Sequence, residues 1–101
     1  MDFGRGMLDH WMLDPGITYL NHGTVGAVPR PVLAAQQEIR DEMERRPSQF
    51  LLRDLSGLVG RPERREAPTR MRQAAGEVAA FLGARGDDLV FVDNATTGVN
   101  A

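Results

Sequence analysis

The 101-residue sequence predicts an α/β fold. Two short apolar runs, residues 17–20 and 89–92, have the composition of β-strands, and the chain between them places apolar residues at helical spacing. After the second run, the last residues look like the beginning of one more helix. Strand, helices, strand and helix in this order are typical of α/β proteins, whose parallel sheets are covered by helices on both faces.

Residues 1–29 are predicted to form an N-terminal arm, a short strand and an Asn-His-Gly loop. Pro15-Gly16 is a strong turn signal that ends the arm, and residues 11–13 supply apolar side chains with which the arm docks on a larger body. The β-branched and aromatic run Ile17-Thr18-Tyr19-Leu20 predicts the strand. The glycine-rich loop 21–26 follows this strand directly.

Residues 30–101 are predicted to form helices that lead into the strand and turn of an incomplete domain. Pro31 suits the first turn of a helix, and Pro47 stops that helix near Arg46. Its apolar positions recur at helical spacing: Val32, Ala35, Ile39 and Met43. Apolar residues between positions 50 and 59 predict a second, short helix.

A third helix is predicted to begin at Thr69, and Gly83 suits its C-cap. Its apolar stripe consists of Met71, Ala75, Val78 and Leu82. The charged, proline-containing segment 60–66 is predicted to be a solvated connecting loop. Gly86-Asp87-Asp88 then turns the chain into the final strand, 89–92.

The end of the chain carries a candidate phosphate-binding turn. The polar stretch 93–97 separates the predicted buried strand from a helix that is expected to open at Gly98. A helix N-terminus behind a strand binds phosphate through free backbone N–H groups and the positive end of the helix dipole. Thr96 and Thr97 add hydroxyl donors, and the small Ala95 lets the backbone approach a ligand. Ordinary helix capping explains the same residue types without a ligand, so both interpretations remain open.

Asn21, His22 and Gly23 form a second candidate site. They follow a predicted strand, and α/β sheets bind ligands at the carboxyl ends of their strands. The alternative is a simple turn in which Asn21 bonds its own backbone and His22 is solvated. Because this triplet and the turn 93–97 both follow strands, the two stretches could converge on one crevice.

Composition excludes several classes of function. The net charge of −2 gives no electrostatic case for nucleic acid or an anionic membrane. The absence of cysteine and the presence of two histidines argue against a metal site. Nothing resembles a signal peptide or the ~20-residue apolar run of a membrane span, so a cytoplasmic location is expected. All twelve basic residues are arginine, so a reaction that needs a lysine amine cannot be completed within these residues.

Three stretches together resemble the class V aminotransferase family, in its isopenicillin N epimerase-like branch. They are Tyr19-Leu20-Asn21-His22-Gly23-Thr24-Val25-Gly26, Phe81-Leu82-Gly83-Ala84, and the run from Leu89 to Asn100. The family consists of fold-type-I enzymes that use pyridoxal 5'-phosphate (PLP). The resemblance implies the N-terminal portion of the large PLP-binding domain, truncated, of an enzyme expected to be a homodimer.

The resemblance also implies roles for the matched positions. Ala95, Thr96 and Thr97 would hold the PLP phosphate, and Asn21, His22 and Gly23 would line the pocket near the carboxylate of an amino-acid substrate. The family's catalytic lysine has no counterpart in this chain, so the fragment alone is expected to be inactive.

Several functions stay open at this stage. Epimerase or aminotransferase chemistry at the α-carbon of an amino acid is favoured, and a cysteine desulfurase or C–S lyase of the same family is the alternative. A hypothesis of another class is a non-enzymatic phosphate-binding α/β module. The missing lysine suits that module, whereas the unpaired short strands and the unfinished last helix argue against it.

Overall fold

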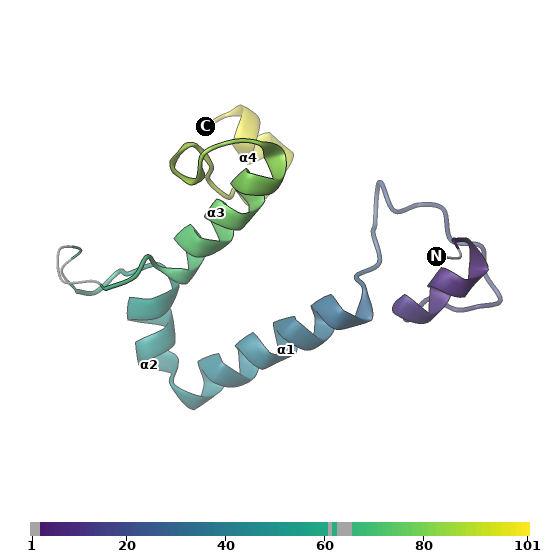
Figure 1. The fold of residues 1–101 in the computed structure, drawn as a ribbon, viewed down its shortest axis with the longest axis horizontal. Helices are drawn as coiled ribbons and strands as arrows, with labels where there is room; N and C mark the ends of the chain where they lie inside the picture. The colour runs from purple at the N-terminus through teal and green to yellow at the C-terminus, as the bar shows by residue number, and fades with distance from the viewer. Residues whose placement is uncertain (1–2, 61, 63–65) are drawn as a thin grey trace. The chain divides into compact units, whose positions relative to one another are not determined.

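The computed structural model describes residues 3–60, 62 and 66–101 (Figure 1). The chain divides into two compact units, Met1–Arg45 and Arg46–Ala101.

The first unit contains a 3-10 helix, η1 (Arg5–His10), and a long α-helix, α1 (Arg30–Arg45). The Nε of Arg30 donates a hydrogen bond to the carbonyl of Trp11 at 2.9 Å and so ties the start of α1 to the residue after η1. The bounds of α1 confirm the helix predicted between Pro31 and Pro47. Proline fits the first turn because its missing N–H is not needed there, and Pro47 cannot continue the helical bonding.

The second unit opens with a helix of two parts, α2 (Pro47–Gln49) and the π-helical η2 (Phe50–Leu55). Phe50 is buried here, and the guanidinium carbon of Arg70 lies 5.0 Å from the centre of its ring. The second predicted helix is thereby confirmed, although it ends before Leu58. After it the chain folds back, because the N–H of Val59 donates to the carbonyl of Leu52 at 2.8 Å.

Helix α3 (Arg70–Leu82) begins and ends where the sequence predicts. The Oγ1 of Thr69 accepts a hydrogen bond from the N–H of Arg72 at 3.4 Å, which is an N-cap. Gly83 has a left-handed φ of 72°. The N–H of Ala84 donates to the carbonyl of Ala79 at 2.8 Å, and the N–H of Gly83 donates to that of Ala80 at 3.2 Å. This pair of bonds is a Schellman motif, which favours glycine at its left-handed position.

Two short helices follow. The 3-10 helix η4 (Gly86–Asp88) confirms the predicted turn, and α4 (Ala95–Val99) is the last helix of the described residues. The expectation that the last helix opens at Gly98 is wrong, because α4 begins at Ala95. The side chain of Asn94 accepts from the N–H of Thr97 at 2.8 Å and so starts the helix three residues earlier.

The predicted α/β class is wrong for the described residues, which contain helices and no β-strand. Residues 17–20 and 89–92 have no regular secondary structure, although Leu89 is extended at φ −116° and ψ 131°. An extended segment becomes a strand only by pairing with another segment, and neither run has such a partner in the part of the chain that the structure describes. The truncated PLP-binding domain expected at the sequence level therefore has no sheet here.

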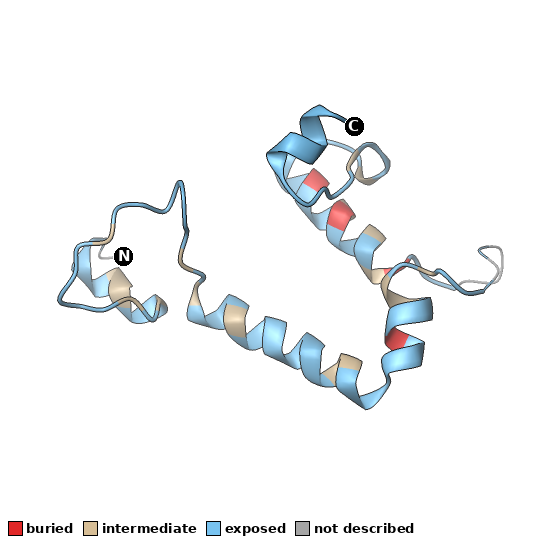
Figure 2. Cartoon of the chain, turned by 180° about the vertical axis from the view of Figure 1, so that it is seen from behind, coloured by how far each residue is buried: buried red, intermediate tan, exposed pale blue. Residues whose placement is uncertain are grey.

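Few side chains are buried (Figure 2). Phe50, Thr69, Ala75 and Ala79 are buried, all in the second unit. The large residues of the predicted α3 stripe are instead exposed, Leu82 by 64%. The run expected to be a buried strand is exposed as well, with Val90 at 74%. The face of α3 that η2 and η4 cover carries Ala75 and Ala79. Their small side chains let these two elements approach the helix closely.

The predicted loop 60–66 lies largely outside the described residues, since Arg61 and residues 63–65 are not among them. Within the described ranges, every helix is too short or too polar to cross a bilayer.

This burial leads to a prediction for the chain prepared alone. Many large apolar side chains are open to solvent, so we expect no cooperative thermal transition for the 101-residue chain and a tendency to aggregate. Circular dichroism during heating, together with size-exclusion chromatography, checks this. A sharp unfolding transition of a purified monomer would contradict it.

Candidate functional site

The first candidate site is the loop after Tyr19, within the first unit. The hydroxyl of Tyr19 donates to the carbonyl of Val25 and lies 3.5 Å from that of Asn21. The N–H of Val25 donates to the carbonyl of Asn21 at 3.1 Å. The loop is therefore closed on itself, with Tyr19 and the backbone of Asn21 joining its two ends.

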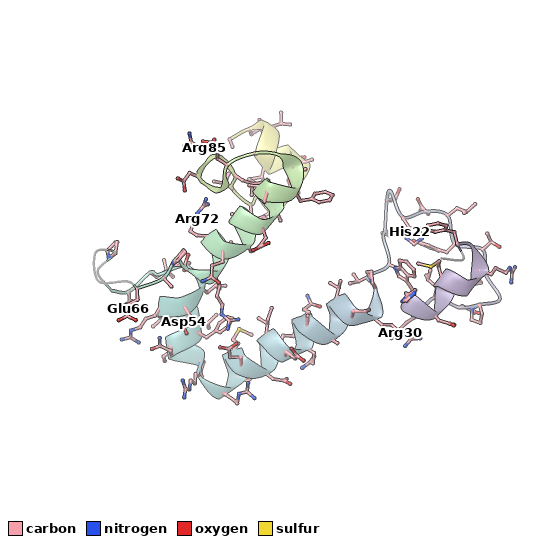
Figure 3. All side chains as sticks on the ribbon, viewed as in Figure 1. His22, Arg30, Asp54, Glu66, Arg72 and Arg85 are labelled. Carbon is pink, nitrogen blue, oxygen red and sulfur yellow. The ribbon has the colours of Figure 1, made fainter. Side chains whose placement is uncertain are left out.

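His22, which is labelled in Figure 3, makes two contacts inside this loop. The N–H of Ala27 donates to Nδ1 of His22 at 3.3 Å, and the rings of Tyr19 and His22 meet edge to face with their centres 4.8 Å apart. Because Nδ1 accepts a hydrogen bond, the neutral imidazole carries its proton on Nε2. His22 is exposed, so its Nε2–H is placed to donate to an anionic ligand such as a carboxylate.

Alanine substitution should have different effects at the two glycines of this loop. A Cβ added at Gly26 would lie 3.2 Å from the carbonyl oxygen of His22, whereas one added at Gly23 would meet nothing within 4 Å. We expect Gly26→Ala to cost the loop about 1 kcal/mol by overpacking and to speed hydrogen exchange at the Val25 amide. Gly23→Ala is the matched control and should leave that rate unchanged. Equal exchange rates in both variants would contradict the prediction.

The second candidate site is the turn that starts α4, within the second unit. Ala95, Thr96 and Thr97 are the first three residues of that helix, and all are exposed. Asn94 supplies the cap, so the capping interpretation is confirmed for Asn94 but not for the threonine hydroxyls. Neither hydroxyl makes a hydrogen bond to any other described residue. Both hydroxyls are therefore available to a ligand, whereas the Thr97 N–H is already used by the cap.

The two candidate sites belong to different compact units. Asn21, His22 and Gly23 lie in Met1–Arg45, and the residues 95–97 lie in Arg46–Ala101. Their convergence on one crevice therefore stays a prediction.

A cleft in the second unit lies away from the predicted site residues. Its volume is about 610 Å³, and it is formed by η2 and the start of α3. Its charged lining residues are Arg53, Asp54, Glu66 and Arg70. Charges of both signs line it, and it contains none of the six predicted residues. No group of metal-ligating side chains occurs in the described ranges.

Arg72 is the residue whose role the sequence did not reveal. Its guanidinium donates to the carbonyls of Gly86 and Leu89, the latter at 2.9 Å. The only available signal was its spacing, because Arg72 lies four residues before Gly76 and therefore shares its side of α3.

Comparison with known proteins gives one informative match. The chain is 36% identical over 88 residues to isopenicillin N epimerase from Amycolatopsis lactamdurans. The match covers 87% of this chain and 19% of that protein, so the chain spans about a fifth of its relative's length. No family model matches the chain, and no solved structure matches it. By its name the relative is an epimerase and therefore an enzyme.

Proposed function

We propose that this chain is the N-terminal part of a PLP-dependent enzyme that acts at the α-carbon of an amino acid. The observation that carries the proposal is the 36% identity to isopenicillin N epimerase over most of the chain. The resemblance of the loop 19–26 and of the run from Leu89 to Asn100 to PLP-dependent enzymes supports it. The complete enzyme would be a homodimer.

The residues at the start of α4 fit the phosphate of PLP. Two exposed threonine hydroxyls and the N-terminal end of a helix offer donors to an anion, and Ala95 leaves room for it. We propose Ala95, Thr96 and Thr97 as the phosphate ligands. When bound, PLP supplies an electron sink for a carbanion at the substrate's α-carbon.

The loop at His22 fits the substrate. An Nε2–H donor that is fixed by Ala27 and Tyr19 suits the carboxylate that every α-amino acid carries. We propose that His22 binds this carboxylate, with Asn21 and Gly23 beside it. This role orients the amino acid and moves no proton at the α-carbon.

Of three alternative reactions we favour epimerisation. Transamination is the second candidate, and cleavage of a C–S bond is the third. These reactions differ in where the proton or leaving group goes after the α-proton has left. The named relative is an epimerase, which is the reason for this order.

The proposal is tested on the intact gene product, meaning the longest reading frame that contains residues 1–101. We expect the purified protein to carry PLP, seen by its visible absorption, and to exchange the α-proton of an amino acid for deuterium in D2O. NMR of a panel of L- and D-amino acids detects that exchange. Formation of the opposite enantiomer indicates epimerisation, whereas formation of an α-keto acid indicates transamination. A protein that neither binds PLP nor exchanges an α-proton would refute the proposal.

A further inference from the structure

Arg72, on α3, is hydrogen-bonded to residues 86–89, the segment that follows this helix. Its Nη1 donates to the carbonyl of Leu89 at 2.9 Å, and its Nη2 donates to the carbonyl of Gly86. The planar guanidinium presents its N–H donors in a rigid fork, so one side chain fixes two carbonyls at a set spacing. The side chain is half-buried, in contrast to Arg85, which is exposed and pairs with Asp88 at 3.3 Å.

A backbone contact reinforces this attachment. A Cβ added at Gly86 would lie only 3.1 Å from the Cα of Gly76 on α3. The backbones of η4 and α3 therefore lie so close that a side chain at position 86 would require them to separate by a few tenths of an ångström. Residues 86–89 are thus held on α3 both by the two hydrogen bonds from Arg72 and by the close approach of Gly86 to Gly76.

The anchored segment leads directly to the turn 95–97. Three residues after Leu89, the Cγ2 atom of Val92 packs beside α4, where a Cβ added at Gly98 would meet it at 3.3 Å. Asn94 joins the same helix through its side chain to the N–H of Thr97 and through its carbonyl to the N–H of Gly98, at 2.8 and 3.0 Å. A shift of Leu89 would therefore be transmitted to the first turn of α4.

We infer that Arg72 is a positioning residue for the turn 95–97. It touches no ligand itself, but it fixes the point from which the chain enters the turn. The inference rests on the proposed function in one respect, namely that the ligand of this turn is the phosphate of PLP. A displaced turn no longer holds its hydroxyl donors at hydrogen-bonding distance from the phosphate. Loss of the two Arg72 hydrogen bonds should therefore weaken phosphate binding although Arg72 makes no contact with the phosphate.

The first part of the test needs no cofactor. In the intact gene product, hydrogen exchange is measured at the bonded amides of Thr97, Gly98 and Asn100. We expect Arg72→Gln to speed exchange there at least tenfold while the α3 amide of Gln73 is unaffected. Arg72→Lys should give an intermediate rate, because an ammonium can hold one of the carbonyls. Arg85→Gln is the matched control with the same loss of charge and should have no effect.

The exchange rates test the positioning role of Arg72 independently of the proposed function. Unchanged exchange in α4, or equal acceleration in α3 and α4, would overturn the positioning role. Should Arg72→Gln fail to fold, Arg72→Lys and Gly86→Ala disturb the same attachment more mildly, and unchanged α4 exchange in both would likewise overturn it.

The second part compares PLP with pyridoxal, which lacks the phosphate. We expect Arg72→Gln to raise the Kd for PLP about tenfold to a hundredfold, the change that loss of one hydrogen bond to a charged group produces, and to leave the Kd for pyridoxal unchanged. Equal loss of both ligands would overturn a role at the phosphate. If no variant, the unaltered protein included, binds PLP, the proposed function fails, whereas the exchange measurement still decides whether Arg72 positions the turn.

Discussion

The 101-residue chain, prepared alone, should turn over no amino acid and should form no PLP adduct at a defined position. An enzyme of the proposed kind bonds the PLP aldehyde through a lysine amine that is desolvated and held in place. This chain has twelve basic residues, all of them arginine. Its remaining amine is the N-terminal one, so reductive trapping with borohydride and mass analysis of the digest should find label at Met1 and nowhere else.

The control for this experiment is an unrelated lysine-free peptide with a free N-terminus. Labelling of Met1 should proceed at the same rate in the chain and in the peptide, since no residue of the chain is expected to activate that amine. Measurable turnover of any amino acid by the pure chain would show that the required chemistry is present within these residues, against the proposal that they are part of a longer enzyme.

Thr96→Ala and Thr97→Ala should each weaken PLP binding by the intact gene product about tenfold to a hundredfold. Both hydroxyls are exposed and make no hydrogen bond to another described residue, so the substitutions remove a donor without breaking an internal bond. Loss of a hydrogen bond to a charged group costs about 1.5–3 kcal/mol, which corresponds to that change in affinity. A fluorescence or absorbance titration with PLP measures it.

Two further variants separate ligand binding from helix capping. Thr96→Ser keeps the hydroxyl and should retain most of the affinity for PLP. Asn94→Ala removes the cap of α4, at a cost of about 1 kcal/mol to that helix, so it should weaken PLP by less than tenfold and leave pyridoxal unchanged, because it loosens the turn and keeps both hydroxyls. Unchanged affinity in both threonine-to-alanine variants would leave the turn with no role beyond starting α4.

The helices were predictable because residues close in sequence determine where each helix begins and ends. Pro31 and Pro47 bracket α1, and Thr69 and Gly83 bracket α3, through backbone chemistry that needs no distant partner. The start of α4 was misplaced because several residues in the turn can cap a helix, and the choice of Asn94 over a threonine depends on the detailed backbone path.

The strands could not be predicted in the same way. The run at residues 89–92 has the composition of a buried strand, but a strand exists only where a second segment pairs with it. Of the candidate site, the sequence predicted the loop at His22 and the turn at Thr96. It did not predict Arg72, because an arginine that donates to two carbonyls has the same sequence signature as one on a solvated helix face.

The caps of α3 have a consequence during synthesis on the ribosome. Thr69 and Gly83 are close in sequence, so the helix can form as soon as this stretch has left the exit tunnel, within microseconds and long before the next residues are added. The apolar side chains on its outer face, Val78 and Phe81 among them, are then displayed while translation continues. A nascent chain in this state presents an apolar surface of the kind that molecular chaperones bind.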